Sequence, residues 1–144
     1  MEKFILFASN QWLLITAVAA AIWALAWLEN QRAGKALTPV ALTSMINRDE
    51  NAVVVDLRDK TEFDEGHIVA AINLPFSTWQ GEHREGGQTQ LEKYAGKSLV
   101  LVCKLGQQSS HVARRLAAEK FAGVYRLSGG VAEWRGAQLP LVKS

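Results

Sequence analysis

A single cysteine, Cys103, is the strongest candidate for covalent chemistry in this chain. It ends an apolar run, SLVLVC (98–103), that is typical of a buried strand, and Lys104–Ser109 separates it from a helical pattern beginning at Ser110. Backbone N–H groups converge at a strand-to-helix turn, and the positive end of the helix dipole favours a thiolate there. A buried structural cysteine is the alternative, because free cysteine is among the most buried residue types.

Composition limits the function classes open to the chain. Its 144 residues suffice for one compact domain with a short appendage. The formal net charge of +2, with acids and bases interspersed, does not indicate a nucleic-acid-binding surface. No Cys/His cluster has metal-ligand spacing, so the sequence predicts neither a metal site nor a cofactor. The thiol is therefore either inert or used for chemistry that begins and ends on one sulfur.

The N-terminal apolar segment, Trp12–Leu28, contains no charged residue. At about 1.5 Å per residue its length is close to the ~30 Å hydrocarbon core of a bilayer, and its tryptophans are typical of membrane interfaces. A buried core helix is the alternative, but a segment apolar on all faces is hard to cover in so small a domain. We expect a transmembrane anchor at 1–28, a polar linker at 29–36 and a folded domain at 37–144.

The residues on either side of this segment indicate whether it is cleaved and how it is oriented in the membrane. Ala24–Ala26 resembles a signal-peptide cleavage site, but the apolar run continues through Leu28, which favours a retained single-pass anchor over a cleaved signal peptide. Arg32 and Lys35 follow the segment, whereas only Lys3 precedes it. The positive-inside rule then favours the inner (plasma) membrane with a cytoplasmic C-terminal domain.

Helical and strand patterns alternate along the rest of the chain. Thr38 followed by Pro39 predicts the start of a helix, with Thr38 as its N-cap. Further helical patterns lie at 61–65, 110–120 and 131–135. Extended segments are expected at 52–56, 68–74, 99–103 and 124–127, and a polar surface loop at 77–90. This alternation predicts an α/β domain whose mainly parallel sheet has helices on both faces.

Three motifs resemble the signatures of the rhodanese family, in matching order and spacing. The first comprises VVVDLR (53–58), EFDEGHI (62–68) and AINLP (71–75). The others are CKLGQQS (103–109), similar to the active-site loop, and LSGGVAEW (127–134), similar to the C-terminal signature. The resemblance covers about 38–141 and implies a rhodanese-like fold. An anchor before a single such domain further resembles the small membrane-tethered rhodaneses of Gram-negative bacteria.

The resemblance also implies a sulfurtransferase activity. In this family a cysteine thiolate takes a sulfane sulfur from a donor such as thiosulfate, becomes a persulfide, and passes the sulfur to cyanide or a thiol. It assigns catalysis to Cys103 and persulfide or substrate binding to Lys104, Leu105, Gly106, Gln107, Gln108 and Ser109. The partners it implies are a small sulfur donor or protein persulfide, a thiol acceptor, the membrane and a membrane protein. Gly106 would let the loop curl, and Ser109 would cap the next helix and also donate a hydrogen bond to the sulfur.

Gln108 departs from the family pattern, in which an arginine often precedes the serine. A neutral amide attracts no anionic donor through charge, and Lys104 is the only cation in the loop, where it would partly substitute. A non-catalytic rhodanese-like module that binds a membrane-associated protein therefore stays an alternative to the sulfurtransferase. The related phosphatases need Cys-x5-Arg, because the arginine binds the phosphoryl oxygens. Ser109 occupies that arginine position here, so the sequence does not favour a phosphatase.

Several other polar residues are expected to support the fold. Asp56 and Arg58 match the first rhodanese signature, and we expect them to tie the strand end to nearby loops. His67 is expected to satisfy backbone groups, and Trp134 to anchor the core. His111 is expected at the surface, because a protonated ring in the first helical turn would oppose the helix dipole.

Overall fold

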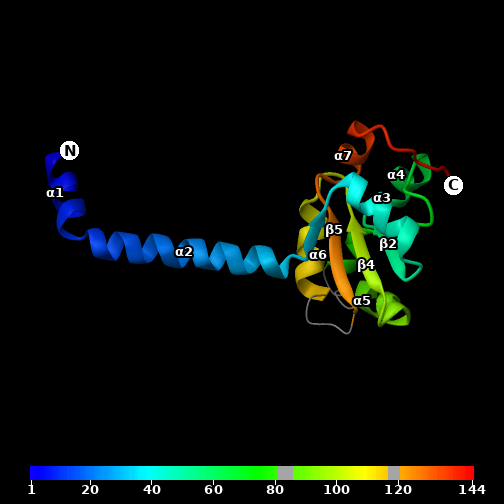
Figure 1. Ribbon diagram of the computed structural model, residues 1–144, viewed down its shortest axis with the longest axis horizontal. Coiled ribbons are helices and arrows are strands. Elements are labelled where there is room, and N and C mark those ends of the chain that lie inside the picture. The colour runs from blue at the N-terminus through cyan, green and yellow to red at the C-terminus, as the bar shows by residue number, and fades with distance from the viewer. Residues whose placement is uncertain (81–85, 117–120) are drawn as a thin grey trace. The chain divides into compact units, whose positions relative to one another are not determined.

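The structure is a computed structural model of residues 1–144 and describes residues 1–80, 86–116 and 121–144 (Figure 1). It divides into two compact units, Met1–Gln31 and Arg32–Ser144. The first unit contains α1 (Glu2–Asn10) and most of α2 (Trp12–Arg32). The second unit is an α/β domain, which contains the parallel sheet and Cys103.

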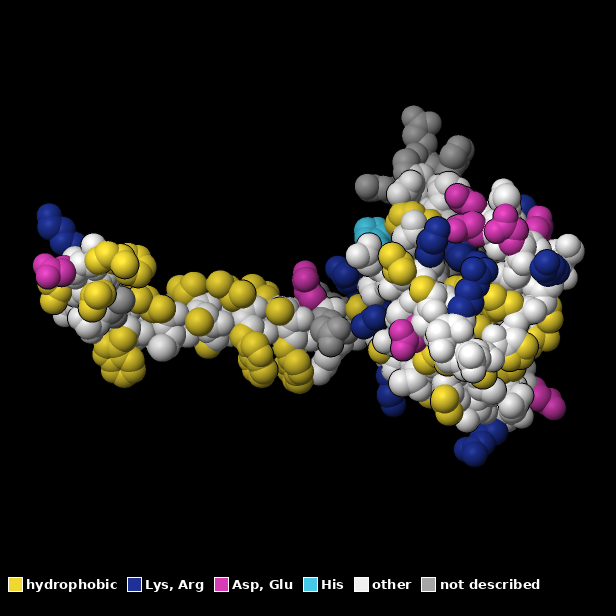
Figure 2. All heavy atoms as spheres, turned by 90° about the horizontal axis from the view of Figure 1, so that it is seen from above, with side chains coloured by type: hydrophobic (Ala, Val, Ile, Leu, Met, Phe, Trp, Pro, Cys, Tyr) yellow, Lys and Arg dark blue, Asp and Glu magenta, His cyan; other side chains and the backbone are white. Residues whose placement is uncertain are grey.

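Helix α2 is long and apolar enough to cross a membrane over Trp12–Glu29. Large apolar side chains are exposed along the helix, and Figure 2 shows them on the face in view. The hydroxyl of Thr16 donates a hydrogen bond to the carbonyl oxygen of Trp12 at 2.9 Å, so this hydroxyl is satisfied within the helix itself. Indole rings stack one turn apart, with the centroids of Trp23 and Trp27 at 6.5 Å.

Among the described residues, five parallel strands form one sheet in the order β1-β5-β4-β2-β3. They are β1 (Lys35–Leu37), β2 (Ala52–Asp56), β3 (Ile72–Asn73), β4 (Ser98–Val102) and β5 (Gly123–Leu127). The apolar runs of β2 and β4 suit this position, because a parallel sheet is covered on both faces. The parallel sheet with alternating helices confirms the predicted fold class.

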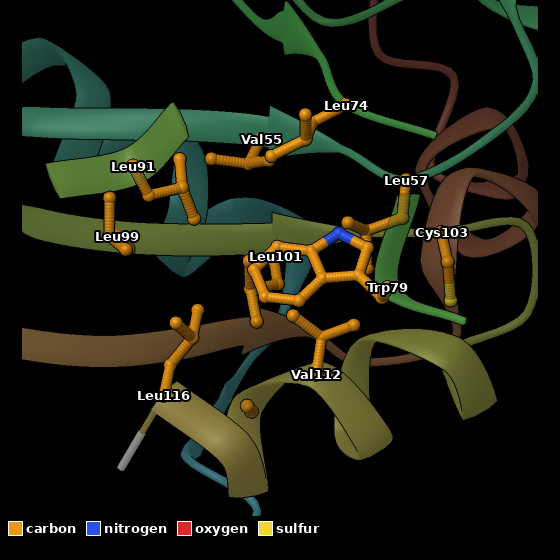
Figure 3. Packing of buried hydrophobic residues seen from close by; sticks show 11 residues of the cluster. Val55, Leu57, Leu74, Trp79, Leu91, Leu99, Leu101, Cys103, Val112 and Leu116 are labelled. Atoms are coloured by element: carbon orange, nitrogen blue, oxygen red, sulfur yellow. The ribbon is translucent and has the colours of Figure 1, made fainter. Parts of the chain in front are cut away.

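Helices cover the sheet on both faces. They are α3 (Pro39–Arg48), α4 (Lys60–Glu65), η1 (Phe76–Trp79), α5 (Gly86–Leu91), η3 (Glu92–Tyr94), α6 (Gln107–Leu116) and α7 (Gly130–Gly136). Successive β4 side chains point to opposite faces. Leu99 and Leu101 pack with Trp79 and α6 in one apolar cluster (Figure 3), whereas Val100 and Val102 pack with α3 and α7 in the other.

The start of α3 forms as the sequence predicts. The hydroxyl oxygen of Thr38 accepts a hydrogen bond from the backbone N–H of Ala41 at 3.2 Å, and Pro39 occupies the first helical position. The cap satisfies a donor that the first helical turn cannot pair internally.

Two predicted segments differ from the structure. Within 68–74, only Ile72–Asn73 is a strand. The prediction of a polar surface loop at 77–90 was wrong for its described residues, because η1 and α5 include 77–79 and 86–90 and Trp79 is only 2% exposed, while positions 81–85 lie outside the described residues. A β-carbon on Gly87 would lie 2.4 Å from the indole of Trp79, so a glycine is needed where α5 packs on this ring. The buried indole of Trp79 therefore packs η1 against the start of α5.

The stretch expected as a polar linker, 29–36, is folded over most of its length. Helix α2 continues through Arg32, and β1 begins at Lys35 and pairs with β5. Ala33, between the two elements, is only 3% exposed. The α6 pattern, expected over 110–120, starts earlier at Gln107; positions 117–120 lie outside the described residues, as does His83.

Candidate active site

Cys103 follows β4 directly, at the carboxyl end of a central strand of the sheet. Its side chain is 1% exposed and packs at the edge of the apolar cluster beside Leu57 (Figure 3). The backbone N–H of Gly106 donates a hydrogen bond to the Cys103 Sγ at 2.9 Å. Gly106 has φ +98°, a conformation that favours glycine, so the residue type at this position permits the turn that aims the amide at the sulfur.

A serine hydroxyl also contacts the sulfur. The Cys103 thiol donates to the Oγ of Ser109 at 3.5 Å, and that hydroxyl donates to the carbonyl oxygen of Gly106 at 2.9 Å. Ser109 was expected to cap the following helix; it is instead the third residue of α6, which begins at Gln107. It is fully buried, so its hydroxyl is fixed beside the sulfur.

The amino end of α7 supports the cysteine loop through backbone contacts. The N–H of Val131 donates to the carbonyl oxygen of Cys103 at 2.8 Å, and the N–H of Ala132 donates to that of Lys104 at 3.2 Å. Gly130 has φ +64°, and a β-carbon there would lie 2.3 Å from the Cys103 oxygen. This contact was not predicted from the sequence, although the third rhodanese-like motif contains Gly130.

An open pocket of about 240 Å³ reaches Cys103. Its described lining residues are Leu57, Arg58, Asp59, Glu62, Phe76, Cys103, Lys104, Leu105, Gln107 and Gln108. The six predicted loop residues thus divide into two sets. Lys104, Leu105, Gln107 and Gln108 are exposed and line the pocket, whereas Gly106 and Ser109 are buried and contact the sulfur.

The loop cation is engaged in an ion pair. The Nζ of Lys104 lies 2.9 Å from the Oε1 of Glu62, a residue of α4. Both side chains line the Cys103 pocket, so the charge expected to replace the missing arginine stands beside a carboxylate. Gln108 lines the same pocket and adds no charge.

Asp56 and Arg58 form a buried ion pair at the end of β2. The Nη2 of Arg58 lies 2.7 Å from the Oδ2 of Asp56 and donates to the carbonyl oxygen of Gly66 at 2.8 Å. Asn73 donates to the carbonyl oxygen of Arg58 at 2.8 Å. These contacts join β2, β3 and the end of α4 behind the pocket. Asp56 and Arg58 therefore hold these elements together, and Arg58 also lines the pocket.

The other singled-out residues lie away from the sulfur contacts. The Nδ1 of buried His67 is 2.8 Å from the carbonyl oxygen of Phe63, and its ring stacks on that phenylalanine. The indole N–H of Trp134 donates to the carbonyl oxygen of Pro140 at 3.0 Å. His111 is exposed and meets the edge of Phe76, a pocket residue, at a centroid distance of 5.8 Å.

The chain matches the family model described as Rhodanese-like domain over residues 38–137 and belongs to the rhodanese-like family. It is 40% identical over 109 residues to YibN of Escherichia coli (strain K12), a relative described as uncharacterized, covering 76% of this chain and 73% of that protein. It is 33% identical over 88 residues to the thiosulfate sulfurtransferase GlpE of Pseudomonas syringae, covering 61% of this chain and 76% of GlpE.

A solved structure shows the same fold. The crystal structure of a rhodanese-related protein from Thermoplasma volcanium superimposes with a TM-score of 0.63 at 22% identity, covering 76% of this chain and 99% of that one. The family membership, together with relatives named thiosulfate sulfurtransferase, supports a protein of the sulfurtransferase type.

Proposed function

We propose that this protein is a membrane-anchored sulfurtransferase that carries sulfur as a persulfide on Cys103. In the first half-reaction the Cys103 thiolate attacks the sulfane sulfur of the donor. With thiosulfate, a new S–S bond forms on Cys103, the bond to the sulfonate sulfur breaks, and its electron pair leaves on sulfite. In the second, an acceptor attacks the outer persulfide sulfur and restores the thiolate. Cyanide then yields thiocyanate, and a thiol yields its own persulfide.

One observation carries this proposal: the Gly106 N–H at 2.9 Å and the Ser109 hydroxyl at 3.5 Å converge on a sulfur that an open pocket reaches. The Gly106 N–H already donates to the sulfur, so it stabilises a thiolate or persulfide anion without reorganising during the reaction. When the sulfur is ionised it no longer donates to Ser109, and that hydroxyl then stabilises the anion by turning its hydrogen from the Gly106 carbonyl oxygen toward the sulfur.

The anchor and the partners are the second part of the proposal. Helix α2 inserts in the inner membrane, the domain faces the cytoplasm, and the donor is thiosulfate or a persulfide carried by a protein. A tether raises the effective concentration of the domain near membrane-bound partners, which suits a membrane protein as donor or thiol acceptor. Nucleic acid is not among the proposed partners.

Intact mass measurement tests the chemistry. The full chain in detergent micelles is incubated with thiosulfate and weighed beside its Cys103→Ser variant. We expect the wild type alone to gain the mass of one sulfur atom, which one cysteine in the chain assigns to Cys103. No gain with thiosulfate or with polysulfide would contradict sulfur transfer and leave the non-catalytic binding module as the better hypothesis.

Cell fractionation and reporter fusions test the anchor. We expect the chain to stay in membranes washed at alkaline pH, and a C-terminal green fluorescent protein fusion to fluoresce. Release of the chain by the wash would contradict insertion. Alkaline phosphatase is active only in the periplasm. An active C-terminal alkaline phosphatase fusion, together with a green fluorescent protein fusion that does not fluoresce, would contradict the cytoplasmic orientation.

A further inference from the structure

A second hollow adjoins the pocket of Cys103. It measures about 250 Å³, and its described lining residues are Arg58, Glu62, Glu65, Lys104, Val131, Ala132 and Arg135. Three of them, Arg58, Glu62 and Lys104, also line the Cys103 pocket. The ion pair between Lys104 and Glu62, at 2.9 Å, therefore stands where the two hollows meet.

The charges in the Cys103 pocket are compensated or negative. Among the described lining residues, the charged side chains are Arg58, Asp59, Glu62 and Lys104. Arg58 is bound to Asp56 and to the Gly66 carbonyl oxygen, and Lys104 is bound to Glu62. Asp59 is exposed and has no ion pair with any described residue. A dianion entering this pocket thus meets no uncompensated cation along the described lining.

From this arrangement, and on the basis of the proposed function, we infer that Glu62 is a specificity-determining residue. Its carboxylate neutralises Lys104, and the site consequently disfavours dianionic sulfane donors relative to donors of lower charge. The Coulomb energy between a donor and a lone ammonium scales with the donor charge, whereas a carboxylate at contact distance cancels most of that attraction. Releasing Lys104 from Glu62 should favour a dianion more than a monoanion.

Two donors isolate the effect of charge. Thiosulfate is a dianion, and benzenethiosulfonate presents the same sulfane sulfur on a monoanionic sulfonyl group. In both, the Cys103 thiolate forms an S–S bond with the sulfane sulfur, and the electron pair of the broken bond leaves on sulfite or on benzenesulfinate. The ratio of kcat/KM for the two donors, with cyanide as acceptor, therefore reports on charge recognition.

The test compares Glu62→Gln with Glu65→Gln in the full chain in detergent. Both variants remove one negative charge from α4, but Glu65 lines only the second hollow. We expect Glu62→Gln to raise kcat/KM for thiosulfate about tenfold and for benzenethiosulfonate about threefold at low salt. Glu65→Gln should change either value by less than about twofold, and added salt should shrink the Glu62→Gln effect.

Lys104→Gln provides a second, opposite test. It leaves Glu62 without its ammonium partner, so the thiosulfate-to-benzenethiosulfonate ratio should fall below that of the wild type. A ratio that is unchanged or raised in Lys104→Gln, or unchanged in Glu62→Gln, would overturn the role of Glu62. The wild-type mass after benzenethiosulfonate separates this failure from a wider one. If the wild type forms a persulfide with benzenethiosulfonate, the proposed sulfurtransferase function stands and only the role of Glu62 in specificity fails. If it forms no persulfide with either donor, both proposals are overturned.

Discussion

The backbone of Gly130 lies directly against the carbonyl oxygen of Cys103. A β-carbon at Gly130 would come within 2.3 Å of that oxygen and within 2.5 Å of the carbonyl oxygen of Lys104. The approach lets the N–H of Val131 donate to the Cys103 oxygen at 2.8 Å. The orientation of the nucleophile's own peptide group thus depends on a residue that has no side chain and lies at the start of helix α7.

Gly130→Ala should therefore lower sulfur transfer and stability together. The added methyl group collides with backbone, which cannot turn aside as a flexible side chain can, and φ +64° adds strain. We expect a loss of about 2–4 kcal/mol in the free energy of unfolding. Gly136→Ala is the matched control, since nothing lies within 4 Å of a β-carbon at that end of α7. Equal urea midpoints for the two variants would contradict the contact.

Ser109 and Ser110 allow the sulfur contact to be separated from the carbonyl contact. Both hydroxyls donate to the Gly106 carbonyl oxygen, at 2.9 and 3.0 Å, but Ser109 also meets the Cys103 sulfur. Ser109→Ala should slow persulfide formation about 10- to 100-fold, because it removes a hydroxyl that contacts the sulfur and can donate to it once the sulfur is ionised. Ser110→Ala should slow it by less than about threefold. Single-turnover mass measurements with thiosulfate give the rate of persulfide formation in each variant. Comparable rates in Ser109→Ala and Ser110→Ala would show that the Ser109 hydroxyl has no role in the mechanism.

The parts of this site that follow one another along the chain were predictable, and the parts joined across the fold were not. The apolar run before Cys103 and the glycine three residues later specify a strand and a tight turn locally. The approach of Gly130 and the pairing of Lys104 with Glu62 depend on where α7 and α4 pack, which no local pattern encodes. Trp79 illustrates the same limit, because its polar neighbours masked a buried side chain.

The buried ion pair behind the pocket should be far more important for stability than a surface pair on the adjoining helix. Asp56→Asn leaves the Arg58 charge buried without its carboxylate, with side-chain exposures of 4% and 1% in the wild type, and should cost about 3–5 kcal/mol. Asp64→Asn breaks the exposed pair with Lys60 and should cost less than about 1 kcal/mol. Urea denaturation followed by circular dichroism measures the stability of both variants. Similar unfolding midpoints would contradict a structural role for the ion pair between Asp56 and Arg58.

Gln108→Arg should improve the use of thiosulfate, because Gln108 lines the Cys103 pocket and is exposed. A guanidinium there would bind sulfonate oxygens through two parallel N–H groups, an arrangement that a neutral amide cannot match. We expect kcat/KM for thiosulfate to rise about tenfold, mainly through a lower KM. Gln90→Arg adds the same charge on α5, where Gln90 is exposed and lines a different hollow, and should have little effect.

The two arginine variants separate local recognition from overall charge. If both raise kcat/KM equally, the increase comes from the net charge of the domain steering anions toward it, and it should then disappear at high ionic strength. If neither does, an anionic donor does not reach the sulfur past Gln108. The donor would then approach from the side of Lys104 and Glu62, where the second hollow adjoins the pocket. An increase confined to Gln108→Arg would show that a cation at position 108 recognises thiosulfate locally.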